Sequence, residues 1–472
     1  MNHRPARMLR ALAALGFLFT FAHDARADLT EIPFVNPIEQ AAARANQGVY
    51  NQLIAAGCQD QARVGSGNCT GITFQIFSRL RELVHTSNEL EGGNGGSTEF
   101  SLGLDQEGLG FAMRWTAAEE LAAQGSSITE FSSSQQHTLA SRISALRFAA
   151  RTGMGGGSAA DGSGIAGRWS AFADASYGYG RKDDTSDPFL TEPVSGSEDA
   201  FDFDGQDFTL GVDYRMTPQM VIGVLVGHTT RAVDFDSSVS IVDANIDSDG
   251  LSLLGYLLWE GERAYVTGSL GAQSISHDMR RRITYPSLNV LVSPIDVTVH
   301  SSADSKVFLG SVTGGFNFPL GGFNIDPYLK LDYQALKIDG FREAGDSGFE
   351  LRVGDQDVNS LDASLGLKMQ YVFTPSFGVL VPYLRGALHK ELQNDQRSIS
   401  STYAGLGNGG PINPADDFDL ATDKRDDQFV IAAAGFSAVF KHGLQGFLQY
   451  QRVFGLDTFT DSAITGGVRY EF

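Results

Sequence analysis

The chain has 472 residues, with 35 Lys and Arg against 56 Asp and Glu, so its formal net charge is −21. This acidity argues against a nucleic-acid partner, because phosphate contacts require clustered Lys and Arg side chains. The 55 Gly, 32 Phe and only 14 Pro suit a β-rich chain with many turns better than a disordered one.

Residues 1–27 have the features of a secretory signal peptide. Arg4, Arg7 and Arg10 precede a mostly apolar run, 11–22, that is too short to span a bilayer comfortably. An Ala-Arg-Ala site follows, so we expect cleavage between Ala27 and Asp28. The rival interpretation is a buried N-terminal helix, which the Arg and small-residue flanks disfavour. No later stretch approaches roughly 18 consecutive apolar residues, so we expect either a β-barrel or a protein soluble outside the cytoplasm.

Residues 28–125 have a helical pattern and are interpreted as a short exported region. Helices are predicted from Pro37 to about Ala56, over 71–90 and over 109–124. Cys58 and Cys69 flank a small loop in this exported segment, which favours a disulfide between them, with two free thiols as the alternative. Residues 126–166 are interpreted as a linker helix followed by a Gly/Ser-rich hinge.

From residue 167 to 472 the chain alternates apolar and polar residues with period two, which is typical of β-strands. In the clearest stretch Leu361 and Leu365 fall on one face, whereas Asp362 and Ser364 fall on the other. A soluble β-sandwich would give the same alternation, so this pattern by itself does not distinguish the two.

The connection lengths distinguish them. About twelve strands can be counted, and every second connection is very short, as at 217–218 and 261–262. The intervening connections are mostly long and acidic, around 181–205, 232–244, 340–357 and 393–425. An even number of strands with alternating short and long connections is typical of an outer-membrane β-barrel, with short turns in the periplasm and long loops outside the cell. Aromatic residues near the short turns indicate a membrane-interface girdle.

The last strand has a distinctive end. A Gly pair is followed by alternating apolar residues and a terminal Phe, a pattern that resembles the sorting signal read by the outer-membrane barrel assembly machinery. We therefore expect this machinery, periplasmic chaperones and outer-membrane lipid as partners of a monomer. The residues of this assembly signal are Gly467, Val468, Tyr470 and Phe472.

Over roughly 110–472 the chain resembles the autotransporter (type V secretion) β-domain family. The segment 423–472 resembles that family's last three strands, and 385–391 resembles its ninth-strand region. Residues 115–120 and 130–151 resemble the helical segment that precedes many family barrels. The resemblance implies a twelve-stranded barrel threaded by a helix, and delivery of an N-terminal passenger to the cell surface. The chain departs from the family in its short passenger, 28 to about 125, and in lacking a paired-Asn linker for self-cleavage.

The expected fold is therefore all-β and transmembrane: a twelve-stranded antiparallel outer-membrane β-barrel with a lumenal helix, preceded by a small α-helical region. The lumenal helix is predicted over 136–151, where Leu139, Ile143 and Leu146 form an apolar stripe and Arg142 and Arg147 project elsewhere. The alternative is that this stripe packs against 71–90 in the exported region. Inward-facing acids that could pair with the arginines are Asp174, Asp213, Asp332, Asp362 and Glu391.

No catalytic, metal or cofactor site is predicted, because no nucleophile–base set and no metal-ligand spacing occurs. The predicted function is outer-membrane autotransport, with the short N-terminal region presented at the cell surface. The main alternative is a plugged porin-like or structural barrel whose helical region stays in the periplasm. A surface enzyme or adhesin with an unidentified ligand is a further alternative.

Overall fold

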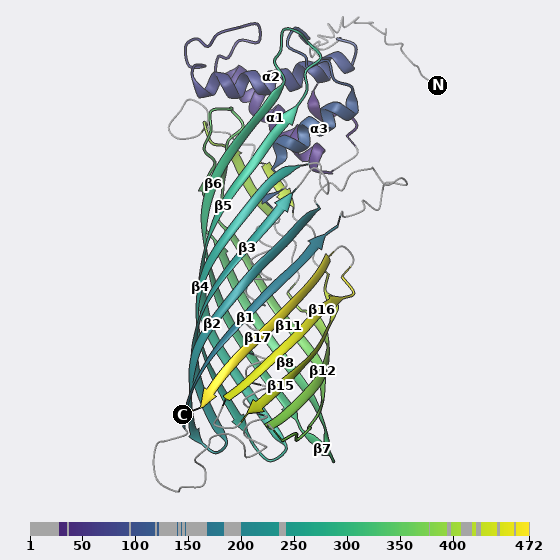
Figure 1. The fold of residues 1–472 in the computed structure, drawn as a ribbon. Helices are drawn as coiled ribbons and strands as arrows, with labels where there is room; N and C mark the ends of the chain where they lie inside the picture. Colours follow the sequence, from purple (N-terminus) through teal and green to yellow (C-terminus); the bar gives the residue numbers. More distant parts are fainter. Residues whose placement is uncertain are drawn as a thin grey trace, which may run out of the picture.

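The computed structural model describes residues 28–34, 37–93, 96–118, 120–121, 139, 143, 147, 168–183, 200–235, 242–376, 378–393, 398–406, 418–421, 426–440, 444–456 and 459–471. Figure 1 shows a tall β-barrel with a group of helices at one end. Among the described residues, no helix combines the length and the apolar character needed to cross a membrane.

Twelve long strands of the described residues form one closed antiparallel barrel, which confirms the predicted fold class. Successive barrel strands pair along the chain, and β1 closes the barrel by pairing with β17 from Ser170↔Glu471 to Lys182↔Phe459. Closure leaves no unpaired strand edge, as a hydrocarbon environment requires. The strands are β1 (Trp169–Lys182), β2 (Phe201–Thr217), β3 (Met220–Phe235), β4 (Asp243–Glu260), β5 (Ala264–Tyr285), β6 (Ile295–Phe316), β8 (Phe323–Ile338), β11 (Gln356–Tyr371), β12 (Gly378–Glu391), β15 (Gln428–Phe440), β16 (Leu444–Phe454) and β17 (Phe459–Glu471).

The two ends of the barrel differ in their connections. Short turns join β2 to β3 and β4 to β5 at the end of the barrel where the C-terminus and the short strand β7 (Phe318–Leu320) lie (Figure 1). The long connections β5–β6, β8–β11 and β12–β15 lie at the opposite end, beside the helices. We call these the turn end and the loop end.

Side chains alternate between the two faces of the barrel wall as the period-two pattern predicted. Leu365 is 62% exposed on the outer face, whereas its neighbour Ser364 is 1% exposed on the inner face. Outward-facing aromatic rings gather near the turn end, where Trp169 packs on Tyr214 with centroids 4.8 Å apart and Phe323 packs on Tyr371 at 4.6 Å. An apolar outer face with an aromatic row at its edge is the surface that a lipid bilayer requires.

On the inner face of the barrel wall, aromatic rings pack over glycines of the neighbouring strands. Tyr328 lies opposite Gly366 and Tyr256 lies opposite Gly223, and a Cβ added at either glycine would overlap the ring. The same arrangement occurs at five further register pairs. Only glycine leaves the space that these rings occupy. The further pairs are Phe172–Gly211, Phe203–Gly180, Tyr265–Gly315, Tyr383–Gly435 and Phe447–Gly467.

The facing pattern reverses towards the loop end of β5 and β6. Up to Ala272 and its neighbour Phe308 the outward residues are apolar, but the next outward pair is Ser274 and Lys306. Beyond this point apolar side chains such as Ile275 face inward and are buried. The upper parts of these strands therefore form a wall with a polar outside and an apolar inside, as in a water-soluble domain.

Three helices form a cap at the loop end. They are α1 (Pro37–Ala55), α2 (Ile72–Leu90) and α3 (Gln106–Ala117), preceded by the short helix η1 (Leu29–Glu31). Asp105 caps α3 by accepting a hydrogen bond from the Gly108 amide at 2.9 Å, and α3 ends at Ala118 in a left-handed conformation. Leu53, Phe77 and Met113 are fully buried between the helices, so the cap has its own core.

The long connections also contain regular structure. The connections 340–357 and 393–425 contain strands β9 (Phe341–Arg342), β10 (Leu351–Val353), β13 (Ser398–Tyr403) and β14 (Phe418–Ala421), which form a separate small sheet. The first residues of β2 and β6, from 201 and 295, belong to the part of each strand in which the apolar side chains face inward.

Candidate functional site

The barrel lumen holds three described residues from the predicted linker helix. Leu139, Ile143 and Arg147 are helical positions spaced by four residues, and all three are buried. They line a cavity together with wall residues Thr267, Ser311, Tyr328 and others of β5, β6, β8, β11 and β12. Arg142 and Leu146 lie outside the described residues.

Arg147 is anchored to the wall near the turn end. Its Nη1 donates to Asp326 Oδ2 at 2.7 Å, and its Nε lies 3.8 Å from Glu260 Oε1. Its guanidinium carbon lies 3.1 Å from the centre of the Tyr265 ring. None of these three partners was predicted from the sequence, because a period-two pattern does not distinguish one inward-facing acid or ring from another.

The acids that the sequence analysis did single out line the lumen but mostly bond to the wall itself. Asp332 pairs with Lys330 at 2.9 Å, and Asp362 with His389 at 2.7 Å. Asp213 accepts from Ser170 at 2.5 Å, and Glu391 accepts from Ser360 at 2.5 Å; Asp174 is buried on the same face. The Lys330–Asp332 pair lies within β8, whereas the other three contacts tie neighbouring strands together.

The lumen wall around Ser364 is cationic. This allows a test of which residues of β11 face the lumen and which face the lipid. Ser364 lines the cavity with Arg147, Lys330, Lys368 and Arg385. Leu365→Arg places a charge on the lipid face and is expected to cost about 2–4 kcal/mol of barrel stability. Ser364→Asp places a charge one residue away among cations and should be tolerated. Heat-modifiability on gels measures folded barrel; equal loss for both variants would contradict the register.

At the loop end, a buried ion pair joins the wall to the β8–β11 connection. Arg281 on β5 binds Glu343 through two nitrogens, at 2.9 and 2.6 Å, and both side chains are at most 4% exposed. The same guanidinium donates to the Trp115 carbonyl of α3 at 3.1 Å and to the Phe349 carbonyl at 3.3 Å. One side chain therefore connects a barrel strand, a cap helix and the β8–β11 connection.

Further hydrogen bonds cross the same interface. Tyr403 of β13 donates to Asn46 Oδ1 of α1 at 2.7 Å, and both residues are buried. The Leu288 amide of the β5–β6 connection donates to the Leu102 carbonyl at 2.7 Å. Arg79 Nε of α2 donates to the Ser347 carbonyl of the β8–β11 connection at 3.4 Å, so the cap contacts three of the long connections through hydrogen bonds as well as apolar packing.

Glu120 is a buried acid beside this ion pair. It is 2% exposed, and no other described residue donates a hydrogen bond to either carboxylate oxygen. Burial raises the pKa of the Glu120 carboxyl to about 7, although the Arg281 and Arg114 cations act to lower it. An acid that titrates near neutral pH lies where the cap meets the barrel.

This carboxyl makes cap stability depend on pH. Because its pKa is raised in the folded state, its contribution is fully present below the unfolded value of about 4.5 and is lost as pH rises through 7. Glu120→Gln should therefore stabilise the cap at pH 8 by about 1–3 kcal/mol and have little effect at pH 5. Thermal melts followed by fluorescence at both pH values measure this. The exposed Glu31→Gln is the control, and a gain at pH 5 equal to that at pH 8 would contradict the assignment.

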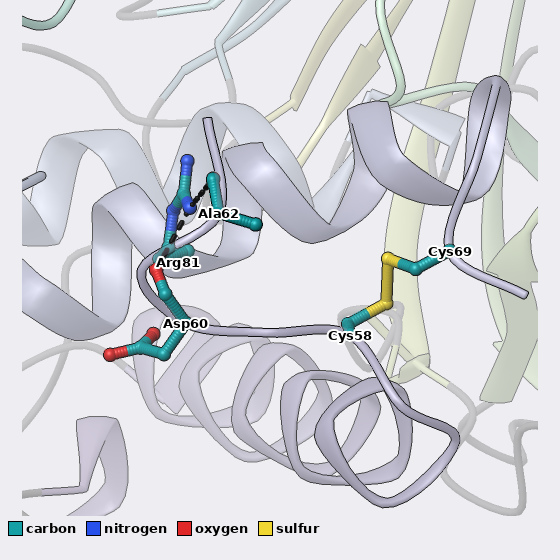
Figure 2. The surroundings of a disulfide bond; sticks show 5 residues. All are labelled: Cys58, Asp60, Ala62, Cys69 and Arg81. Carbon is teal, nitrogen blue, oxygen red and sulfur yellow. Dashed lines mark hydrogen bonds between the residues drawn. A yellow bond between two sulfur atoms is a disulfide. The ribbon is translucent and has the colours of Figure 1, made fainter. Parts of the chain in front are cut away.

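Figure 2 shows the disulfide between Cys58 and Cys69, whose Cα atoms are 5.2 Å apart. The loop that it closes is held by Arg81, which donates to the carbonyls of Asp60 at 2.9 Å and Ala62 at 2.6 Å. The Asp60 carboxylate accepts from Tyr50 at 2.6 Å and lies 3.0 Å from His85 Nε2. These hydrogen bonds lower the pKa of Asp60 despite its partial burial. The cluster is well satisfied and serves to hold the loop against α2.

The other predicted site residues lie at the two ends of the chain. Gly467, Val468 and Tyr470 lie on β17 beside β1, with Val468 and Tyr470 exposed on the outer face. Asp28 caps η1 by accepting from the Thr30 amide at 2.8 Å. Phe472 and Ala27 lie outside the described residues. Within the described ranges no group of three or more His, Cys, Asp or Glu could hold a metal ion.

A closed barrel with an apolar outer face, an aromatic girdle and a polar lumen defines an outer-membrane β-barrel protein. A family model, the autotransporter beta-domain, matches residues 192–451, more than half of the chain. The chain belongs to the autotransporter beta-domain family and is located in the outer membrane.

Known proteins with similar sequence or fold agree with this family. The translocator domain of the autotransporter NalP from Neisseria meningitidis is 16% identical, with a TM-score of 0.50 over 73% of this chain and 98% of that one. Outer membrane protein A of Rickettsia conorii is 20% identical over 234 residues, 48% of this chain and 11% of that protein. Lipase 1 of Photorhabdus luminescens is 20% identical over 195 residues, 41% of this chain and 28% of that protein. The chain thus spans only about a tenth of the first relative's length.

Proposed function

We propose that this chain transports its own N-terminal region, residues 28–121, through the outer membrane and keeps it docked as a cap on the outside of its barrel. The proposal has two parts: the cap is at the cell surface, and it is retained there. The family supports the first part, since its barrels are translocators. The packing of the cap supports the second.

The observation that carries the proposal is a buried core shared by the cap and the long connections. This core contains Phe77 and Met113 from the cap, Ile283 from β5, and Phe349 and Tyr403 from the connections. In outer-membrane barrels long connections face outward and short turns face the periplasm. A cap that folds together with the long connections is therefore expected on the outside.

Retention follows from the buried polar contacts. Separating the cap would remove the Trp115 carbonyl that accepts a hydrogen bond from Arg281, and it would expose the shared apolar core to water. The lumen residues, ending at Arg147 on Asp326, provide a second attachment below the cap. We infer a permanently attached cap rather than a released passenger.

Epitope tags on intact cells test the location of the cap. A tag inserted at Gly92–Gly93, at the exposed end of α2, should be detected by antibody without permeabilisation. A tag in the 261–263 turn is the matched control and should be detected only after permeabilisation, because that turn lies at the opposite end of the barrel. The reverse pattern would support the alternative of a plugged barrel with a periplasmic helical region.

The remaining parts of the proposal concern export and assembly. Signal cleavage between Ala27 and Asp28, oxidation of Cys58 and Cys69 during export, and recognition of the terminal strand by the barrel assembly machinery all belong to it. We propose that the chain divides into an exported region (28–125), a linker (126–166) and the barrel (167–472). That the whole chain is non-enzymatic also stays a prediction.

A further inference from the structure

The connection between β5 and β6 ends in an apolar projection. We call residues 286–292 the β5–β6 tip. Three of its aliphatic side chains are strongly exposed: Leu288 at 72%, Val290 at 99% and Leu291 at 62%. Single exposed aliphatic residues are ordinary, but three within four positions at the end of a long hairpin form an apolar patch of the kind that marks an interaction site.

The tip is held in one conformation. Asn289 Nδ2 donates to the Ser101 carbonyl at 2.8 Å and the Glu99 carbonyl at 3.2 Å, which attaches the tip to the segment before α3. Asn289 Oδ1 accepts from the Leu291 amide at 2.9 Å, and the buried Val292 closes the turn. The three aliphatic side chains therefore stay exposed because the backbone around them is fixed, which lowers the entropic cost of binding.

The tip stands far from the membrane in which the barrel sits. The last apolar outward residue on β5 is Ala272, and the outward residues beyond it include Ser274, Asp278 and Arg282. The twelve residues from Ser274 to Tyr285 span about 40 Å along the strand, or about 30 Å along the membrane normal at the usual barrel tilt. The tip cannot reach the acyl chains of its own bilayer.

The charge and the exposed apolar area of the tip limit the classes of partner that it can bind. No charged residue occurs from Ile283 to Ile295, and the chain as a whole carries a net charge of −21, so an anionic surface would not be attracted. Three aliphatic side chains offer on the order of 300–400 Å², well below the roughly 800 Å² per partner of a stable protein complex. Insertion into lipid has no such minimum, because each aliphatic side chain that enters the acyl region contributes separately.

We propose that the β5–β6 tip inserts into the acyl region of an uncharged phospholipid bilayer that faces the cell, so that the cap adheres to an apposed membrane. The proposal rests on the proposed function, since the tip meets another membrane only if the cap is outside the cell. Each contact is weak and reversible, and many barrels on one surface would act together.

Co-flotation of the full-length protein in nanodiscs with phosphatidylcholine vesicles tests the insertion. Wild-type discs should float with the vesicles, whereas the double variant Val290→Asp/Leu291→Asp should bind at least about tenfold more weakly. Ser293→Asp is the matched control: it adds a charge to the same loop, at an exposed position, without removing an aliphatic side chain. It should float like wild type.

A second readout reports insertion directly. Trp fluorescence of Val290→Trp should shift to shorter wavelength with phosphatidylcholine vesicles and be quenched by brominated acyl chains. Equal flotation of wild type and the double variant, flotation only with anionic vesicles, or disc–disc association that the double variant abolishes would each overturn the proposal. Nanodiscs expose both ends of the barrel, so failure here is separate from failure of the epitope-tag experiment.

Discussion

Arg281→Met should detach the cap while the barrel stays folded. The change leaves Glu343 as an uncompensated buried charge and removes the bond to the Trp115 carbonyl of α3. Breaking one partner of a buried ion pair costs about 3–5 kcal/mol, enough to dominate a small interface. Protease digestion of the purified protein measures the result: residues 28–121 should be degraded in the variant, while the barrel remains heat-modifiable.

The neighbouring residue supplies the matched control. Arg282 lies on the outer face of the same strand and pairs with Asp296 at 2.8 Å, with both side chains at least 40% exposed. Arg282→Met should leave the cap attached, because an exposed ion pair contributes little to stability. Replacing both Arg281 and Glu343 with apolar residues should restore part of the lost stability, because no buried charge is then left alone. Equal sensitivity of Arg281→Met and Arg282→Met would contradict the interface.

The full-length protein should conduct poorly in planar bilayers, and deletion of residues 28–151 should raise its conductance strongly. A twelve-stranded barrel is wider than the eight-stranded barrels that side chains alone can fill. In this chain Leu139, Ile143 and Arg147 lie inside the barrel, and the cap covers its loop end. Removing both should open a water-filled path. Single-channel recording measures the change.

A pair of point variants tests the anchor rather than the whole plug. Arg147→Ala and Asp326→Asn each remove the 2.7 Å ion pair in the lumen. Both should give brief openings that the wild type lacks, with more openings for Arg147→Ala, because that variant also loses the contacts with Glu260 and Tyr265. If the deletion variant conducts no better than the full chain, these lumen residues do not belong to a plug.

The facing of each side chain along a strand could be predicted from the sequence, but the partner of a lumen residue far along the chain could not. Parity along a strand predicted that Ser364 faces inward and Leu365 outward, because successive side chains must point to opposite faces. The alternation along a strand cannot predict that Arg147 pairs with Asp326 and not with Asp332, since both acids face the lumen. That choice depends on how deep the linker helix lies, which no local pattern records.

The class of fold could be predicted from the sequence, because the period-two pattern, the twelve strand-length segments and the alternating connection lengths are all local properties. Closing these strands into a barrel pairs the edges that would otherwise be left without hydrogen bonds. The sequence also indicated the helical region, because capping and apolar spacing act within a few turns. Only the tertiary structure decided where that region lies. The contact between Arg281 and Glu343 joins residues 62 positions apart, and Tyr403 meets Asn46 across 357. Such pairings arise from shape and burial of the folded chain, so the cap's place on the loop end follows from packing and not from any pattern in its own residues.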